Sequence, residues 1–206
     1  MKKPKVIIYD NDGMILNGGR FSDQYAKEFG VDLATMTPFF DGPFKKCLVD
    51  KADLKEELAQ VLEEWKWNGT VDELLQYWFA VGEATFSEDV YAAATQLKEQ
   101  GMVVCLATNQ EKYRMQHLID TFSYGKAFDE IFFSANLGAY KTDASALEKI
   151  FKTLKEKYGI ADKGAVTYWD DHEENVADFN AFGFNGQLYL GYPSFKVVLS
   201  DYGYRV

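Results

Sequence analysis

The sequence predicts an α/β protein with a Rossmann-like, doubly wound parallel sheet and a small inserted α-helical domain. Short, almost wholly apolar runs alternate with amphipathic helical patterns, and one long interval between two such runs contains helical patterns only. Apolar runs of this kind are typical of strands that helices cover on both faces. Alternating strands and helices are typical of a doubly wound sheet. The 206 residues suit one substantial domain with a smaller insert.

Five apolar runs are the candidate strands. The first, Val6–Tyr9, ends abruptly in Asp10-Asn11-Asp12-Gly13. The other four follow the long interval, and the last of them is the weakest: Met102–Ala107, Ile131–Phe133, Ala165–Trp169 and Gln187–Leu190. Because helical patterns separate these runs, we expect parallel pairing with helical crossovers.

Three helices are predicted among the later strands. Residues 144–158 place Leu147, Ile150, Phe151 and Leu154 on one apolar stripe. A second stripe of Val90, Ala94 and Leu97 ends before Gly101, which suits the left-handed position after a helix. A third helix covers 175–182 and stops at Gly183.

The interval from residue 17 to residue 85 contains no convincing strand. Helical patterns cover Asp23–Phe29 and Leu54–Glu64, and Thr70 with Glu73 forms a capping-box pattern that starts another helix. One βα unit needs only about 30 residues in all, so this interval is an insertion. We therefore expect a core of residues 1–16 and 86–206 and a helical domain of residues 17–85.

The composition excludes several classes of function. With 22 Lys and Arg against 32 Asp and Glu, the formal charge is −10, which disfavours binding to nucleic acids and to anionic membranes. It does not exclude a local site for a small phosphorylated molecule. Two distant cysteines, Cys47 and Cys105, suggest neither a disulfide scaffold nor a zinc site. With no apolar segment long enough for a signal or a membrane span, we expect a cytoplasmic protein, either a monomer or a weak dimer.

Polar residues follow the predicted strands at their carboxyl ends, where open parallel sheets bind ligands. They comprise acids, an amide, a hydroxyl and an amine: Asp10, Asp12, Thr108, Asn109, Lys141, Asp170 and Asp171. Four carboxylates in one cleft would repel each other, and Mg²⁺ would relieve that repulsion while keeping some water ligands. A lysine and a threonine beside the metal suit an anion. The set indicates a phosphoryl-transfer site.

Each element alone has a less specific interpretation. Asp-x-Asp-Gly is often a turn or a solvated acidic patch, and it is no EF-hand loop, because Ile15 and Phe21 stand where glycine and glutamate are needed. The Thr108-Asn109 pair suits a turn or a helix cap, and Asp170-Asp171 suits a cap. The order of these elements, each at a successive strand end, favours the joint interpretation.

On these residues the sequence resembles the haloacid dehalogenase (HAD) superfamily of hydrolases. The four motifs of that family occur in order, as Tyr9–Gly13, Leu106–Asn109, Lys141 within Gly138–Asp143, and Trp169–Asn175. The resemblance covers nearly the whole chain, with residues 17–85 in the place of the type I helical cap. The Asp-Asp-x-x-x-Asn form of the last motif resembles the branch of sugar-phosphate phosphatases and the phosphatase domain of soluble epoxide hydrolase. Met14 and Thr142 depart from the commoner residues at positions that supply no catalytic group.

The resemblance implies a role for each matched residue. Asp10 would attack phosphorus, and Asp12 would act as general acid and then general base. Thr108, Asn109 and Lys141 would bind the phosphoryl group. Mg²⁺ would be bound by Asp10, the Asp12 carbonyl and Asp171, and behind them Asp170 and Asn175 would orient Lys141 and the metal ligands.

The resemblance therefore implies a Mg²⁺-dependent phosphatase for a small organic phosphate monoester, with sugar phosphates as leading candidates. The acid at Asp12 favours phosphate esters over halide displacement, which needs no proton. The alternatives are a phosphomutase of the same fold and a non-catalytic binding or regulatory protein; a receiver-type phosphoacceptor is disfavoured by the helical insert.

The aromatic residues of the insert are expected mainly to pack its core. We expect Phe39, Phe40 and Phe44 to supply any that line a pocket. Arg20 and Lys45 or Lys46 are candidates to contact a substrate hydroxyl or a second anion, although a solvated surface role is favoured for them.

Overall fold

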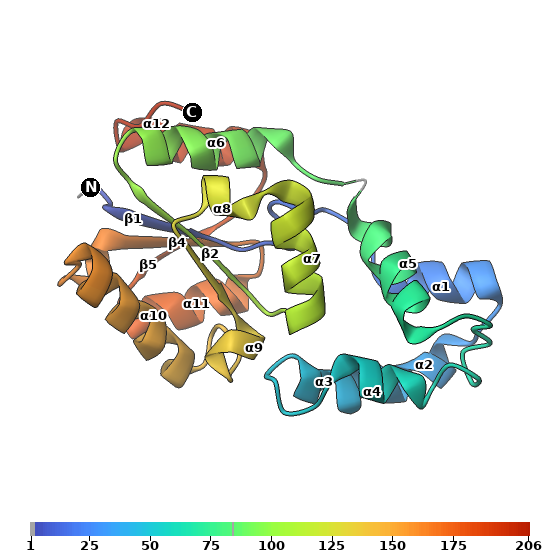
Figure 1. The fold of residues 1–206 in the computed structure, drawn as a ribbon. Coiled ribbons are helices and arrows are strands. Elements are labelled where there is room, and N and C mark those ends of the chain that lie inside the picture. Colours follow the sequence, from blue (N-terminus) through green and yellow to red (C-terminus); the bar gives the residue numbers. More distant parts are fainter. Residues whose placement is uncertain (1–2, 84) are drawn as a thin grey trace.

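The computed structural model describes residues 3–83 and 85–206 and has a five-stranded parallel sheet in the order β3-β2-β1-β4-β5 (Figure 1). The strands are β1 (Val6–Tyr9), β2 (Val103–Thr108), β3 (Glu130–Phe133), β4 (Val166–Asp170) and β5 (Asn185–Leu188). With β1 in the centre, the later strands add on both of its sides, as a doubly wound sheet requires. The predicted fold class is confirmed.

Helices cover both faces of the sheet. The first face carries α6 (Glu88–Glu99), α7 (Lys112–Phe122), α8 (Tyr124–Ala127) and α12 (Tyr192–Asp201); the second carries α9 (Ser134–Leu137), α10 (Ala144–Tyr158) and α11 (Glu173–Phe182), with the 3₁₀ turn η1 (Lys163–Ala165) before β4. Side chains of a strand alternate between faces. Accordingly, Ile7 and Tyr9 pack into the first core, whereas Val6 and Ile8 pack into the second.

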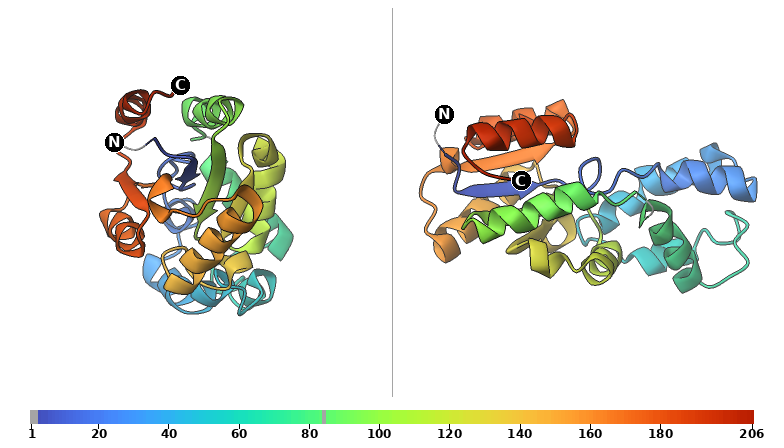
Figure 2. Two further views of the ribbon diagram at one scale, coloured as in Figure 1. Left: turned by 90° about the vertical axis from the view of Figure 1, so that its left-hand side faces the viewer. Right: turned by 90° about the horizontal axis from the view of Figure 1, so that it is seen from above.

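A group of five helices lies between β1 and α6 and beyond the carboxyl end of β1 (Figures 1 and 2). They are α1 (Phe21–Phe29), α2 (Leu33–Asp41), α3 (Pro43–Cys47), α4 (Leu54–Ala59) and α5 (Val71–Glu83). This helical cap has its own apolar core, in which Trp65, Tyr25 and Leu58 are fully buried. The chain leaves and re-enters the sheet side by side, because Leu16 forms an antiparallel bridge with Phe86. We propose the division into residues 1–16 with 86–206 and residues 17–85 on this basis.

Several predicted elements have different bounds in the structure. The last strand is Asn185–Leu188 instead of Gln187–Leu190, because the chain resumes an extended course directly after the left-handed cap at Gly183. The predicted helix over 54–64 ends at Ala59 and continues as turns to residue 66. The helix at 144–158 and the Thr70–Glu73 capping box are confirmed, with Thr70 N donating to Glu73 Oε2 at 2.7 Å.

No sequence pattern predicted α2, α3, α7, α8, α9 and α12. Four of these have at most nine residues, too few to show a clear apolar period. In the described residues, no helix has the length and apolar character needed to cross a membrane.

Candidate active site

The ends of β1, β2 and β4 lie level with one another at one edge of the sheet. Tyr9 stands opposite both Leu106 and Trp169 in the strand register, and Asp10 N donates to Trp169 O at 2.9 Å. Asp10, Thr108 and Asp170 therefore lie at the carboxyl edge, and all three are buried. The register thus brings these strand ends together, as the sequence predicts.

Lys141 forms ion pairs with two carboxylates at this edge. Its Nζ lies 2.7 Å from Asp10 Oδ2 and 2.7 Å from Asp170 Oδ2, and only 3% of its side chain is exposed. The main chain is held as well, since Lys141 N donates to Asn109 Oδ1 at 2.8 Å. A residue that would ordinarily be a solvated lysine is thus a fixed, buried cation between two carboxylates.

Burial and charge act on this cluster in opposite directions. Burial raises the pKa of Asp10 to about 7, Lys141 opposes that rise, and Asp170 adds to it. Burial alone would lower the pKa of Lys141, but Asp10 and Asp170 outweigh it and raise the pKa. One buried ammonium therefore faces two carboxylates, and a further cation at this edge would favour ionised Asp10.

Carboxylates at the end of β4 and just after it add further oxygen atoms to this edge. Asp170 Oδ1 accepts from Asn175 Nδ2 at 2.9 Å and from His172 N at 2.9 Å, which fixes the carboxylate that holds Lys141. Asp171 Oδ1 lies 2.8 Å from His172 Nδ1, and one ligand atom from each of Asp170, Asp171 and His172 lies within 4.8 Å of the others. His172 was not among the residues singled out from the sequence.

Asp171 lies directly against the loop that carries Asp10 and Asp12. Gly13 has φ +86°, and a Cβ at this position would stand 2.1 Å from Asp171 Oδ2. Only glycine leaves room for that carboxylate and adopts this backbone without strain. The contact brings a carboxylate from the end of β4 to the loop after β1. A metal ion bound by both segments would require this proximity, and Mg²⁺ prefers oxygen ligands.

Asp12 has partners that sequence reasoning missed. Arg114 Nη2 and Nη1 lie 2.9 and 3.1 Å from Asp12 Oδ1 and Oδ2, and Gln110 Nε2 also donates to Oδ2. The nearby Asp12 charge outweighs burial and raises the pKa of the Arg114 guanidinium. Its place in the chain could have identified Arg114 as a site residue, because it lies in the first turn of a helix that begins just beyond the end of β2.

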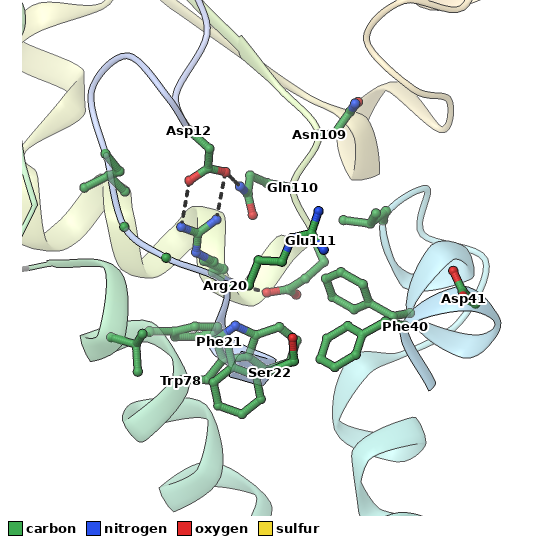
Figure 3. Close-up of a pocket in the computed structure, with 18 of the residues that line it drawn as sticks. Asp12, Arg20, Phe21, Ser22, Phe40, Asp41, Trp78, Asn109, Gln110 and Glu111 are labelled. Atoms are coloured by element: carbon green, nitrogen blue, oxygen red, sulfur yellow. Dashed lines mark hydrogen bonds and ion pairs between the residues drawn. The ribbon is translucent and has the colours of Figure 1, made fainter. Parts of the chain in front are cut away.

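A cavity of about 570 Å³ opens beside Asp12, between the sheet edge and the helical cap (Figure 3). Asp12, Asn109, Gln110, Glu111 and Arg114 line its sheet side. The cap side is largely apolar, with Phe21, Leu33, Phe40, Phe44, Leu48, Trp78, Phe79 and Val81. Its volume lies within the range of sites for small molecules.

The candidate cap residues fall into different places. Phe40 and Phe44 line the cavity, whereas Phe39 does not; it is buried in the cap core with its ring edge-on to Trp65 at 5.0 Å between centroids. Arg20 lines the cavity. Lys45 is an exposed residue paired with Asp41 at 3.1 Å.

No family model matches the sequence, and no curated protein matches it. The fold does match solved structures. A HAD family enzyme from Bacteroides thetaiotaomicron, solved as a magnesium complex, has a TM-score of 0.72 and 19% identity over 91% of this chain and 94% of that one. A predicted HAD-like family hydrolase from Porphyromonas gingivalis has a TM-score of 0.71 and 18% identity over 96% and 98%. The L-2-haloacid dehalogenase of Xanthobacter autotrophicus has a TM-score of 0.63 and 14% identity over 96% and 83%.

Proposed function

Starting from a chain with the fold of HAD family enzymes, we propose a Mg²⁺-dependent phosphatase that hydrolyses a small organic phosphate monoester. The observation that carries this proposal is Lys141, held in the buried edge at 2.7 Å from both Asp10 and Asp170. A fixed cation beside a carboxylate, at the sheet edge from which Asp12 and Asn109 line the cavity, suits the binding and transfer of an anionic phosphoryl group. The Bacteroides thetaiotaomicron enzyme has also been solved with magnesium and inorganic phosphate, which supports this reading.

The donor set suits magnesium. Asp10, the Asp12 carbonyl and Asp171 would hold the ion, and the contact of Asp171 with the Gly13 position supports the pairing of these two segments. When bound, the ion would supply positive charge to the phosphoryl oxygens and to Asp10. Asp170 and Asn175 stand behind Lys141 and the metal ligands and keep them in place.

The proposed reaction then consists of two successive displacements at phosphorus. Asp10 forms a bond to phosphorus while the ester P–O bond breaks, and Asp12 gives its proton to the leaving alkoxide. In the second displacement, Asp12 takes a proton from water, which attacks phosphorus and frees Asp10. Lys141 and the Thr108 hydroxyl, with the Asn109 main chain, hold the phosphoryl oxygens in both. Acid–base help of this kind contributes about 10²–10⁴-fold.

Dehalogenases share the fold, so halide displacement is the competing chemistry. An acid at Asp12 supports ester cleavage, because an alkoxide needs a proton on leaving and a halide does not. A phosphomutase would instead return the phosphoryl group to its substrate and release no net phosphate.

The test is phosphate release from p-nitrophenyl phosphate with Mg²⁺. We expect turnover in the natural protein and none after EDTA treatment or in Asp10→Asn. Asp178→Asn is the matched control, because Asp178 is exposed on α11 outside the site. Undiminished activity of Asp10→Asn would remove the nucleophile assignment, and release of halide instead of phosphate would replace the proposed reaction.

A further inference from the structure

The cavity that opens beside Asp12 has two unlike ends. Its sheet end carries charged and amide groups, and its cap end is built mainly from rings and aliphatic side chains, with Arg20, Ser22, Thr37 and Asp41 beside them (Figure 3). In Figure 3 the rings of Phe21, Phe40 and Trp78 lie across the cavity from Asp12. A substrate with its phosphoryl group at the sheet edge would therefore extend its leaving group toward the rings.

The rings form a continuous wall. Phe21 and Trp78 stack with their centroids 4.5 Å apart, and Phe44 lies 5.3 Å from Trp78. Phe40 meets Trp78 edge-on at 5.7 Å, a separation at which such ring pairs attract. Leu33, at the rim of the same cavity, is 43% exposed. The exposed parts of this wall form an apolar surface that a bound apolar group would cover.

Most polar groups around this wall are already engaged. Asp41 pairs with Lys45 at 3.1 Å, and Thr37 Oγ1 donates to Leu33 O at 2.8 Å. Glu111 accepts from the main-chain amides of Tyr113 and Arg114 at the start of α7. A sugar ring has several hydroxyl groups, and those that face the rings lose water without gaining a partner.

Arg20 is not engaged in this way. Within the described part of the chain, its guanidinium has no ion pair and no side-chain hydrogen bond, although it lines the cavity. A free cation between an apolar wall and a phosphoryl site complements the charge of a phosphate monoester.

We propose that the substrate is a phosphate monoester whose leaving group carries an aromatic or similarly sized apolar ring, bound against Phe21, Phe40, Phe44 and Trp78. This inference rests on the proposed function and replaces sugar phosphates as its leading substrates. The aromatic wall selects the leaving group, and the sheet edge acts on the phosphoryl group.

The test compares two primary alkyl esters, 2-phenylethyl phosphate and glucose 6-phosphate, so that the leaving groups are chemically alike. We expect kcat/KM to favour 2-phenylethyl phosphate by at least about tenfold, since apolar contacts in a pocket discriminate by about 10–200-fold. Trp78→Leu should bring the ratio to within about threefold. Trp67→Leu is the matched control, because Trp67 is a partly buried residue that packs against the cap core and does not line the cavity.

Equal or better turnover of glucose 6-phosphate would overturn the inference, and so would an unchanged ratio in Trp78→Leu. Acetyl phosphate has no ring, so its hydrolysis, lost in Asp10→Asn, would support the proposed function even if ring selection failed. If no ester is hydrolysed, the proposed function fails. Ring selection can then still be tested by comparing the affinity for 2-phenylethylphosphonate with that for methylphosphonate. Tighter binding of the phenylethyl compound, lost in Trp78→Leu, is the expected result; equal binding overturns it.

Discussion

The contact between Arg114 and Asp12 allows a quantitative test of the acid–base assignment. Arg114→Met keeps the length of the side chain and removes its charge and both hydrogen bonds, at 2.9 and 3.1 Å. A hydrogen bond to a charged group contributes about 1.5–3 kcal/mol. Solvent weakens this pair, because the Asp12 side chain is 48% exposed although that of Arg114 is only 18% exposed. We therefore expect the free energy of unfolding to fall by about 2 kcal/mol.

The effect on catalysis should depend on the leaving group. With Arg114 gone, Asp12 is no longer held in one position, and we expect kcat/KM for an alkyl monoester to fall by about 10–100-fold, within the about 10²–10⁴-fold limit for loss of an acid–base group. Nitrophenolate leaves without a proton, so kcat/KM for p-nitrophenyl phosphate should change by less than about threefold. kcat/KM is the right quantity, because it reports steps up to formation of the phosphorylated enzyme.

Steady-state kinetics on both esters, with urea unfolding in parallel, provide the measurement. Asp12→Asn sets the limit for complete loss of the acid, and Arg114→Lys should recover only part of the activity because it lacks the planar fork. Arg205→Met is the matched control, since Arg205 is exposed near the C-terminus. Equal losses for both esters, or no loss for the alkyl ester, would refute the positioning role of Arg114.

Three further predictions concern the same elements. Lys141→Met should abolish phosphate release and lower the free energy of unfolding by about 3–5 kcal/mol, because it leaves Asp10 and Asp170 buried without their cation; urea unfolding that matches the natural protein would contradict this. Gly13→Ala should raise the Mg²⁺ concentration needed for half-maximal activity by at least about tenfold, since its Cβ would collide with Asp171 Oδ2. An unchanged Mg²⁺ titration would count against Asp171 as a ligand. Asp53 in the cap bonds Lys112 and Tyr113 of α7 at 2.9 and 2.7 Å, and these hydrogen bonds outweigh burial and lower its pKa from 3.8 to about 2. The stability that this lowered pKa provides is present above pH 4 and is lost as the pH falls toward 2. Asp53→Asn should therefore lower the free energy of unfolding by about 1 kcal/mol or less at pH 6, and a difference that persists at pH 2 would contradict the ionic contribution.

The sheet was the most predictable part of the molecule. Runs such as Val6–Tyr9 are apolar on both faces, and only strands covered on both faces satisfy that pattern. The long helix at 144–158 was equally clear, because four apolar residues repeat along one stripe. Short helices such as α3 and α9 carry too few turns to show a period, so packing decides them.

The candidate site was predictable in composition and less so in its contacts. Strand ends in a parallel sheet share one edge, which brings Asp10 and Asp170 together, and the loop before α10 adds Lys141 to them. The ion pair of Asp12 with Arg114 depends on the direction in which α7 leaves the sheet, which local sequence does not determine. Phe39 and Phe40 show the same limit, because adjacent rings on one helix face a core and a cavity respectively.

The central claim is that Asp10 carries the phosphoryl group during turnover. The direct measurement is acid quench of the enzyme during hydrolysis of a ³²P-labelled monoester, followed by mapping of the labelled peptide. The account predicts label on the peptide that contains Asp10, released by hydroxylamine as expected for an acyl phosphate, and none in Asp10→Asn. Steady turnover with no label on that peptide, or with label on another residue, would contradict it.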